Sequence, residues 1–546
     1  MRRGVHDAEE AARFLAPKLT YLSDPDELPQ MDTAVARIEQ SIRLKEKIVI
    51  FGDYDVDGIS STCLLLDFFR LIGFPVEYRL PHRLNEGYGL REHTVREFGD
   101  KGVDLLITVD NGSSSREEIR LADELGIDVV VTDHHMPSKD LPEPVALVNP
   151  WVEPDATSFR EFAGVGVTFK LVWGLCQRLS RAKKLSEEFR EFLLDSLALV
   201  ALGTISDVVP LRGENRVLVK FGLIALRNSR RPGIRKLVEA ALRTGRGGGT
   251  RSDAVEARDV GFGLGPRLNA AGRLGCADQA IRLLTTESEE TAAELLDVLE
   301  RENQRRRAIE AEIHADARGR VLEEGLGREK AIVLGDPSWH PGVIGIVASR
   351  LVEEFFRPTV LVALGERCRG SVRSIPGVHI TDALSRCGEC LLSFGGHAVA
   401  AGLEIEASQL GTLRRMLNET IDLPIEEMVP EIEVDLRVDL SKVTGGFLDE
   451  LSRLAPHGAG NPEPLLAAGD LEVVGQPRLM GAKGQHLSFF VRAQGRAFRA
   501  VAFGKGNYYD KIRTNDSRVS LLFRPTWNSW QGRREIELNV RELVVG

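Results

Sequence analysis

Short apolar runs alternate with helical patterns from residue 46 onward. The runs at 48–51, 103–109 and 127–132 predict strands, and the apolar spacing at 59–71 and 116–125 predicts helices that follow them. Near-continuous apolar strands that alternate with helices are typical of a parallel sheet buried on both faces. We therefore predict an α/β domain in which ligands gather at the carboxyl ends of the strands.

The pattern divides the chain into five parts. Residues 1–45 have helical spacing, 46–285 carry the α/β pattern, and 286–328 are a charged, proline-free run that predicts one long connecting helix. Residues 329–426 predict a second, smaller α/β unit. Five short strands are predicted in 427–546, where arginine and aromatic residues are interleaved. This favours an OB-type β-barrel that binds single strands, and a small β domain with core aromatics is the alternative.

Acidic side chains follow the first predicted strand. Asp53, Asp55 and Asp57 lie in a segment where alternation would place the three carboxylates on one side. Like charges this close raise one another's pKa unless a cation offsets them, and carboxylate oxygens suit Mg²⁺ and Mn²⁺. An acidic surface turn is the simpler alternative. A calcium-binding EF-hand is excluded because the twelfth position is Leu64 instead of glutamate.

Further acids and histidines follow the next two predicted strands. Asp110 ends the second, and Asp133, His134 and His135 end the third. Asp207 follows another apolar stretch, which predicts a buried helix. One acidic strand end can be an ordinary surface turn. This explanation is much harder to apply to three successive strands that all end in Asp or His. The sequence therefore favours a metal site at this edge of the sheet.

Glycine, arginine and small polar residues gather in later segments. Arg267, Asn269 and Arg273 lie in a glycine-dense stretch, which suits either phosphate contact or an ordinary structural turn. In the second α/β unit, the side chains and glycine amides that suit an anionic oxygen are Arg350, Ser371, Arg373, Gly395, Gly396 and His397. By contrast, the arginine run 305–307 in the long helix is predicted to be a solvated face.

Composition narrows the class of protein. The 546 residues carry a net charge of −10, which argues against indiscriminate coating of nucleic acid but not against local basic clefts. Six scattered cysteines fit a reducing cytoplasm, and Cys387 and Cys390 are interpreted as structural, with zinc or redox chemistry as the alternative. The longest apolar stretch is far below the ~20 residues of a membrane span. We expect a cytoplasmic protein without membrane contact.

The motifs together resemble a known superfamily. Asp53-Tyr-Asp-Val-Asp-Gly58, Asp110, Asp133-His-His135 and Asp207 occur in the order found in the DHH phosphoesterases. The later motifs narrow the resemblance to the RecJ family of single-strand DNA exonucleases; they are Gly-Pro-Arg267-Leu-Asn-Ala-Ala-Gly-Arg273, Ser371-Val-Arg373 and Gly395-Gly-His397. The resemblance implies a catalytic DHH domain, a long helix, a smaller DHH-associated (DHHA1) domain and an OB-like domain.

The resemblance also implies two bound divalent ions, Mn²⁺ or Mg²⁺. Asp55 and Asp110 would hold one. Asp57, Asp110, His134 and Asp207 would hold the other, so that Asp110 bridges the two.

Roles for the remaining site residues come from the same resemblance. His135 would lie beside the scissile phosphate, and Asp133 would orient the histidines, whereas the role of Asp53 stays open. Arg83 would contact phosphate and Tyr88 would stack near the 5′ end. The residues expected to hold the 5′-terminal phosphate are Ser371, Arg373, Gly395, Gly396 and His397.

The function implied is degradation of single-stranded DNA from a free 5′ end to 5′-mononucleotides, in DNA recombination and repair. A helicase and a single-strand-binding protein are the expected partners. One alternative is a phosphodiesterase for very short RNA or cyclic dinucleotides, which normally lacks an OB-like domain. Another is a non-catalytic DNA-binding scaffold, which would have lost metal ligands.

Overall fold

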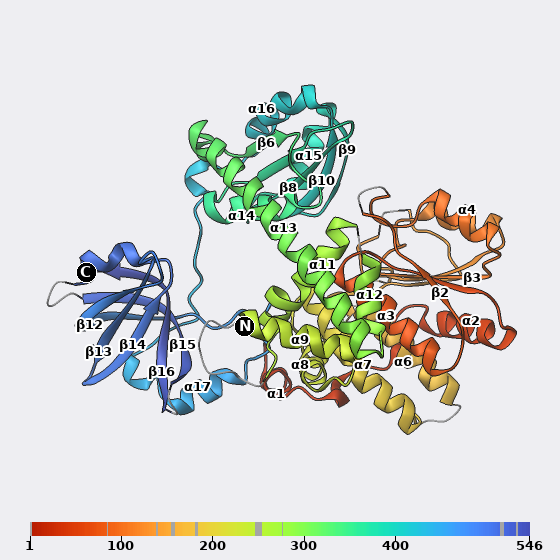
Figure 1. Cartoon of the computed structure of the whole chain (residues 1–546), viewed down its shortest axis with the longest axis horizontal. Coiled ribbons are helices and arrows are strands. Elements are labelled where there is room, and N and C mark those ends of the chain that lie inside the picture. The colour runs from red at the N-terminus through yellow and green to blue at the C-terminus, as the bar shows by residue number, and fades with distance from the viewer. Residues whose placement is uncertain are drawn as a thin grey trace.

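Three sheets divide the chain into three folded units, which Figure 1 shows on the right, at the top and on the left. The computed structural model describes residues 3–83, 86–137, 140–153, 159–180, 184–245, 254–275, 277–513, 518–530 and 533–546. No helix among these residues is long and apolar enough to cross a membrane. Apart from Gly245, the stretch 245–251, which is rich in glycine and arginine and is predicted to be a loop, lies outside them.

The first unit contains a five-stranded sheet of order β2-β1-β3-β4-β5, parallel throughout. Its strands are β1 Ile48–Phe51, β2 Glu77–Arg79, β3 Leu105–Val109, β4 Asp128–Thr132 and β5 Ala146–Val148. Strands β1 and β3 are fully buried. The predicted parallel α/β sheet is therefore confirmed.

Helices cover both faces of this sheet. The apolar core around α3, α6 and α7 lies on one face, and the core that includes Phe51 and Phe98 lies on the other. Burial of one phenylalanine side chain contributes roughly 1.5–3 kcal/mol to the free energy of folding. Packing on both faces therefore holds the strand ends in place. The helices of this unit are α1 Ala8–Leu15, α2 Met31–Leu44, α3 Val56–Leu71, α4 Glu92–Asp100, α5 Arg116–Glu124, α6 Gly164–Ser180, α7 Glu187–Ser206, α8 Gly213–Asn228, α9 Pro232–Gly245, α10 Ala257–Asp259, α11 Gly265–Leu274 and α12 Ala277–Thr285.

One helix, α13 Glu289–Glu323, connects the first unit to the second (Figure 1). Its 35 residues span roughly 50 Å at 1.5 Å per residue. Apolar residues at its start pack on the first unit, and Ile313, Ala317 and Val321 pack on the second. Between these stretches its buried residues are polar: Asn303, Arg306 and Glu310. The prediction that Arg306 belongs to a solvated face is therefore wrong, because this side of the helix faces the junction of the units.

The second unit has a mixed sheet of order β6-β7-β8-β10-β9, in which only β6 and β7 are parallel neighbours. Cys387 and Cys390 lie in its apolar core. The strands are β6 Ile332–Asp336, β7 Thr359–Ala363, β8 Cys368–Arg373, β9 Leu391–Gly396 and β10 Ala400–Ile405, and the helices are α14 Ile344–Phe355, α15 Ile380–Arg386 and α16 Leu410–Thr420.

The third unit is a closed β-barrel, because β12 pairs with both β13 and β15. All five predicted strands are present, and the two-residue strand β11 was not predicted. The elements are β11 Leu436–Arg437, α17 Gly445–Ser452, β12 Leu466–Met480, β13 His486–Ala493, β14 Arg496–Ala502, α18 Tyr509–Ile512, β15 Arg518–Trp530 and β16 Arg533–Val545.

Candidate metal centre

Acidic and histidine side chains from three strand ends and one helix end converge at the carboxyl edge of the first sheet. Asp110 and the two histidines form one group of metal-ligating atoms within 4.8 Å of one another. The other two groups are Asp57, His134 and Asp207, and Asp53, Asp55 and Asp110. The structure thus brings together every residue that the sequence predicted as a metal ligand. The division of these residues between two ions stays a prediction.

The first helix after β1 positions Asp55 and Asp57. Asp55 is the N-cap of α3, and its Oδ1 accepts from the backbone N–H groups of Asp57 (2.9 Å) and Gly58 (3.1 Å). The Asp57 carboxylate accepts from the N–H groups of Gly164 (2.6 Å) and Val165 (2.9 Å) at the start of α6. Capping explains why α3 begins at Val56, three residues before the predicted start.

The backbone of α6 also presses on Asp110. A Cβ atom at Gly164 would lie 2.7 Å from Asp110 Oδ1, so only glycine fits there. Asp110 itself has a φ of 61°, which is unfavourable for a residue with a side chain and costs about 1–3 kcal/mol. Its N–H donates to the Thr132 carbonyl oxygen (2.9 Å), which ties it to the end of β4. The fold thus forces this carboxylate into the cluster.

The two histidines are held from behind by Asp133. Its Oδ1 accepts from the His134 N–H (2.8 Å) and lies 2.8 Å from His135 Nδ1, while its Oδ2 accepts from the Ser113 N–H (3.0 Å). His134 Nε2 consequently lies 3.2 Å from Asp110 Oδ1 and 3.7 Å from one oxygen of Asp57. This geometry agrees with an orienting role for Asp133.

The electrostatics of the cluster favour the binding of a cation. Burial and repulsion between the carboxylates raise the pKa values of Asp53, Asp110 and Asp207 well above the usual range. Burial and the charge of Asp55 raise the pKa of Asp57 to about 7. A positive ion among these oxygens would reverse both effects and let the acids stay ionised at neutral pH.

The histidine pKa values diverge for a physical reason. Burial and the neighbouring His135 lower the pKa of His134 to about 4, so its ring is neutral and its Nε2 is available as a ligand. Burial opposes the charged form of His135 as well, but its hydrogen bond and ion pair with Asp133 prevail and raise its pKa to about 9. The same pair holds the pKa of Asp133 well below its usual range despite burial.

Three buried atoms of the cluster lack a hydrogen-bond partner among the described residues. They are Asp53 Oδ1, Asp110 Oδ1 and His134 Nε2. Buried polar atoms without partners are costly, and a metal ion would satisfy all three. A set of carboxylate oxygens with one or two imidazoles suits Mn²⁺ or Mg²⁺. The residues present therefore fit divalent metal ions as cofactors.

Tyr88 lies against the cluster in a way that the sequence did not indicate. Its hydroxyl is 3.0 Å from His135 Nδ1 and 3.0 Å from the Asp110 carbonyl oxygen. The two rings pack edge to face, with centroids 5.4 Å apart. Tyr88 thus contacts His135 directly, a role that depends on a tertiary contact and leaves no sequence signal. Its predicted stacking on DNA stays a prediction.

The predicted phosphate-binding residues of the first unit differ in their surroundings. Asn269 Oδ1 accepts from the Val56 N–H (3.2 Å), next to the metal cluster. Arg267 is 2% exposed and pairs with Glu300 (2.7 Å), which favours a structural role. Arg273 donates to the Gly342 carbonyl oxygen (3.1 Å) across the junction with the second unit.

Four guanidinium groups gather at this junction: Arg83, Arg273, Arg306 and Arg373. Burial and the charges of the other three lower the pKa of Arg273 to about 9. Burial and Arg83 lower the pKa of Arg373. Like charges held this close indicate a site for an anion. The sequence suggested three members of this group but not Arg306, whose burial depends on the packing of α13.

The second unit contributes its predicted residues at the same junction. Arg373 donates to Ser371 Oγ (3.2 Å), and a Cβ atom at Gly345, near the start of α14, would lie 2.8 Å from that oxygen. Gly395 and Gly396 end β9 next to the exposed His397, whose charge contributes to lowering the pKa of His134. Arg350 pairs with Glu310 (2.7 Å) but is half exposed.

Comparison with known proteins agrees with these three units. Residues 47–204 match the DHH family N-terminal domain, 328–422 match the DHHA1 domain and 434–542 match the RecJ OB domain. Sequence matches include the single-stranded-DNA-specific exonuclease RecJ of Bacillus subtilis, 37% identical over 100% of this chain and 67% of that protein. RecJ of Escherichia coli is 34% identical over 99% of this chain and 94% of its own length.

Solved structures extend the comparison to the fold. A crystal structure of Thermus thermophilus RecJ in complex with Mn²⁺ matches with a TM-score of 0.82 at 34% identity and covers 98% of this chain and 74% of that one. The Mg²⁺ complex of the same protein matches with a TM-score of 0.76 at 32% identity, over 99% and 73% of the two chains. The chain therefore belongs to the RecJ family of single-stranded-DNA-specific exonucleases.

Proposed function

We propose that this chain degrades single-stranded DNA from a free 5′ end to 5′-mononucleotides by two-metal hydrolysis of phosphodiester bonds. The observation that supports this most is that Asp110 belongs to two groups of potential metal ligands. One group contains Asp55 and the other contains His134. Bound divalent ions would supply an activated water and neutralise charge on the phosphodiester.

The protein's own groups would position the substrate. His135, held by Asp133 and Tyr88, would contact the scissile phosphate. The 5′-terminal phosphate would bind between Arg83, the pair Ser371 and Arg373, and the loop of Gly395, Gly396 and His397, with Arg273 and Arg350 nearby. A pocket that holds this phosphate would stop the strand from threading further, so that only terminal nucleotides reach the cluster.

The three units would share the work. We assign hydrolysis to residues 46–285, recognition of the 5′ end to 329–426 and strand binding to 427–546, with 286–328 as the connecting helix. A cytoplasmic role in DNA recombination and repair follows, in which a helicase and a single-strand-binding protein would supply the substrate. The alternative of a phosphodiesterase for very short oligonucleotides is less well supported, because a very short substrate would not need the β-barrel for binding.

One assay tests the proposal. The protein and its Asp110→Ala variant are incubated with Mn²⁺ and a single strand that carries a 5′-phosphate, with the same strand blocked at its 5′ end, with a duplex and with a dinucleotide. We expect mononucleotides from the free 5′ end only, and a loss of at least a hundredfold in the variant. Equal cleavage of the blocked strand would refute the direction, and a preference for the dinucleotide would favour the alternative.

A further inference from the structure

The two histidines of the metal cluster lie in a stretch of chain without regular secondary structure, just after β4. Their backbone polar groups therefore need partners from outside a helix or sheet. The N–H groups of His134 and His135 both donate to Oδ1 of Asp133, at 2.8 and 3.2 Å. Their two carbonyl oxygens are bound by side chains from another part of the chain.

Asn149 and Trp151 bind these two carbonyl oxygens. Trp151 Nε1 donates to the His134 carbonyl oxygen (3.0 Å), and Asn149 Nδ2 donates to that of His135 (2.9 Å). Both residues follow β5, which pairs in parallel with β4 up to the last residue of each strand. The chain after β5 therefore runs beside the histidine pair. We call Asn149 and Trp151 the carbonyl clamp.

The carbonyl clamp and Asp133 belong to one hydrogen-bond network. Asn149 is completely buried, its Oδ1 accepts from the Trp151 N–H (2.9 Å), and its Nδ2 also donates to Ser113 Oγ (2.7 Å). The Ser113 N–H donates in turn to Asp133 Oδ2 (3.0 Å). A buried network whose groups are paired in this way keeps a single geometry. The backbone of the histidine pair is thus held at its N–H groups and at its carbonyl oxygens.

The position of this backbone decides where the His134 ring lies among the acids. Its Nε2 lies 3.2 Å from Asp110 Oδ1 and 3.7 Å from Asp207 Oδ2. A hydrogen bond between the ring and the backbone of Phe162 helps to set the rotation of the ring but not the place of the Cα atom from which the side chain starts. Because metal–ligand distances tolerate changes of only about 0.2 Å, a shift of this Cα would weaken the binding of an ion by the ring.

We propose that Asn149 and Trp151 are positioning residues of the metal centre. By binding the carbonyl oxygens of His134 and His135, they set the place of the His134 ring and so the affinity of the ion that this ring binds. The inference rests on the proposed function, in which His134 is a ligand of one of two divalent ions. The ion assigned to Asp55 and Asp110 has no histidine ligand, so loss of the carbonyl clamp should weaken one ion and spare the other.

Metal binding to the protein without DNA tests the carbonyl clamp. Isothermal titration calorimetry with Mn²⁺ compares the wild type with Trp151→Phe, which keeps an aromatic ring and loses the indole N–H, and with Asn149→Ala. Trp339→Phe is the matched control, because Trp339 Nε1 donates to Asp316 Oδ2 (2.9 Å) in the second unit. We expect the dissociation constant of one ion to rise about tenfold in Trp151→Phe and about 10- to 100-fold in Asn149→Ala, and to change less than about twofold in Trp339→Phe.

Urea unfolding with a chelator present separates metal affinity from stability. Trp151→Phe and Trp339→Phe each lose one indole hydrogen bond, so the urea midpoint should fall by similar amounts in both. Affinity for Mn²⁺ that is unchanged in Trp151→Phe, or that falls equally in Trp151→Phe and Trp339→Phe, would overturn the carbonyl clamp.

Cleavage of a 5′-phosphorylated single strand at increasing Mn²⁺ concentrations distinguishes this inference from the proposed function. Trp151→Phe should need about tenfold more Mn²⁺ for half its maximal rate and should reach a maximal rate within about twofold of the wild type. A maximal rate that stays low at saturating Mn²⁺ would contradict a role limited to metal affinity. A wild type that binds Mn²⁺ through the carbonyl clamp but releases no mononucleotides would leave the clamp standing and refute the proposed function instead.

Discussion

At the scale of single residues, the metal cluster owes its geometry to contacts that the ligands make with backbone groups. Asp57 is fixed by two N–H groups of α6, and Asp133 by the N–H groups of Ser113, which follows β3, and of His134, which follows β4. Each carboxylate therefore keeps its direction even without a bound ion. Such preorganisation lowers the entropic cost of binding a metal.

The role of Asp133 can be separated from that of the ligands. Asp133→Asn keeps the size of the side chain but weakens its hold on the His135 ring, so we expect Mn²⁺ affinity to fall roughly 10- to 100-fold. Isothermal titration calorimetry with Mn²⁺ checks this. Asp128→Asn is the control, because Asp128 lies at the amino end of the same strand, β4, opposite the end that carries the cluster. Unchanged affinity in Asp133→Asn would remove the orienting role.

Two variants of Tyr88 separate the role of its hydroxyl group from that of its aromatic ring. Tyr88→Phe keeps an aromatic ring for stacking and removes the hydroxyl that lies 3.0 Å from His135 Nδ1. If the hydroxyl positions His135, kcat should fall roughly tenfold while KM stays near the wild-type value. Tyr88→Leu, which loses the ring as well, should also raise KM. A Phe variant with unaltered kcat would favour stacking alone.

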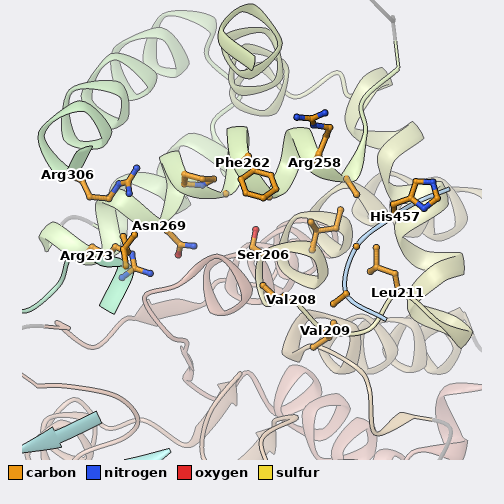
Figure 2. Close-up of a pocket in the computed structure, with 18 residues that line it drawn as sticks. Ser206, Val208, Val209, Leu211, Arg258, Phe262, Asn269, Arg273, Arg306 and His457 are labelled. Atoms are coloured by element: carbon orange, nitrogen blue, oxygen red, sulfur yellow. The ribbon is translucent and has the colours of Figure 1, made fainter. Parts of the chain in front are cut away.

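Sequence reasoning found the residues of the cluster but not those that depend on packing between units. Asp55, Asp110 and His134 follow predicted strands, so strand pattern and motif order sufficed to place them together. Arg306 was misjudged because the identity of its neighbours, not its own local pattern, decides its burial. Phe262 (Figure 2) is 81% exposed, and the sequence gives no sign of this, since a lone phenylalanine in a glycine-rich stretch normally indicates core.

At the scale of elements, α13 combines two kinds of packing along one helix. Its ends bury apolar residues, and its middle buries Arg306 and Glu310, which pair at 2.6 Å. Glu310 also pairs with the half-exposed Arg350 (2.7 Å), and Arg306 donates to Asn303 Oδ1 (3.1 Å). The network ties α13 to α14 at the point where the helix passes the anion site.

Removal of Glu310 should therefore destabilise the protein strongly. Glu310→Ala leaves the guanidinium of Arg306 buried without its partner, which costs about 3–5 kcal/mol. Urea unfolding followed by circular dichroism measures the change. Arg350→Ala removes the exposed partner of the same carboxylate and should cost no more than about 1 kcal/mol. Equal losses in the two variants would contradict the buried role of the Arg306–Glu310 pair.

At the scale of the whole molecule, one arginine fixes the segment that leads to the barrel onto the first unit. Arg216 is 1% exposed and donates to the carbonyl oxygens of Ala455 (2.8 Å), Arg453 (3.1 Å) and Phe14 (2.8 Å). Burial lowers its pKa to about 10, which still leaves it charged at neutral pH. The segment that precedes β12 is thus bound to the first unit by a buried, charged side chain.

His457, in the same segment, makes this attachment sensitive to acid. Burial and the charges of Arg216 and Arg3 lower its pKa from 6.5 to about 4. The unfolded chain therefore binds a proton that the folded protein does not bind between these pH values. Stability contributed by the neutral ring is fully present above pH ~6.5 and is lost as the pH falls toward 4, by about 3 kcal/mol in total.

Substitution of His457 separates its contribution to the pH dependence of stability from the contributions of the aspartate and glutamate residues. His457→Gln keeps a polar side chain of similar length but cannot take up a proton, so the free energy of unfolding of the variant should fall less between pH 7 and pH ~4.5 than that of the wild type. Urea unfolding at several pH values measures both curves. His314→Gln is the control, because His314 lies half-buried on α13, far along the chain from this segment. Parallel curves for wild type and His457→Gln would show that the ring takes up a proton as readily in the folded protein as in the unfolded chain, and the attachment of the barrel would then not depend on its neutrality.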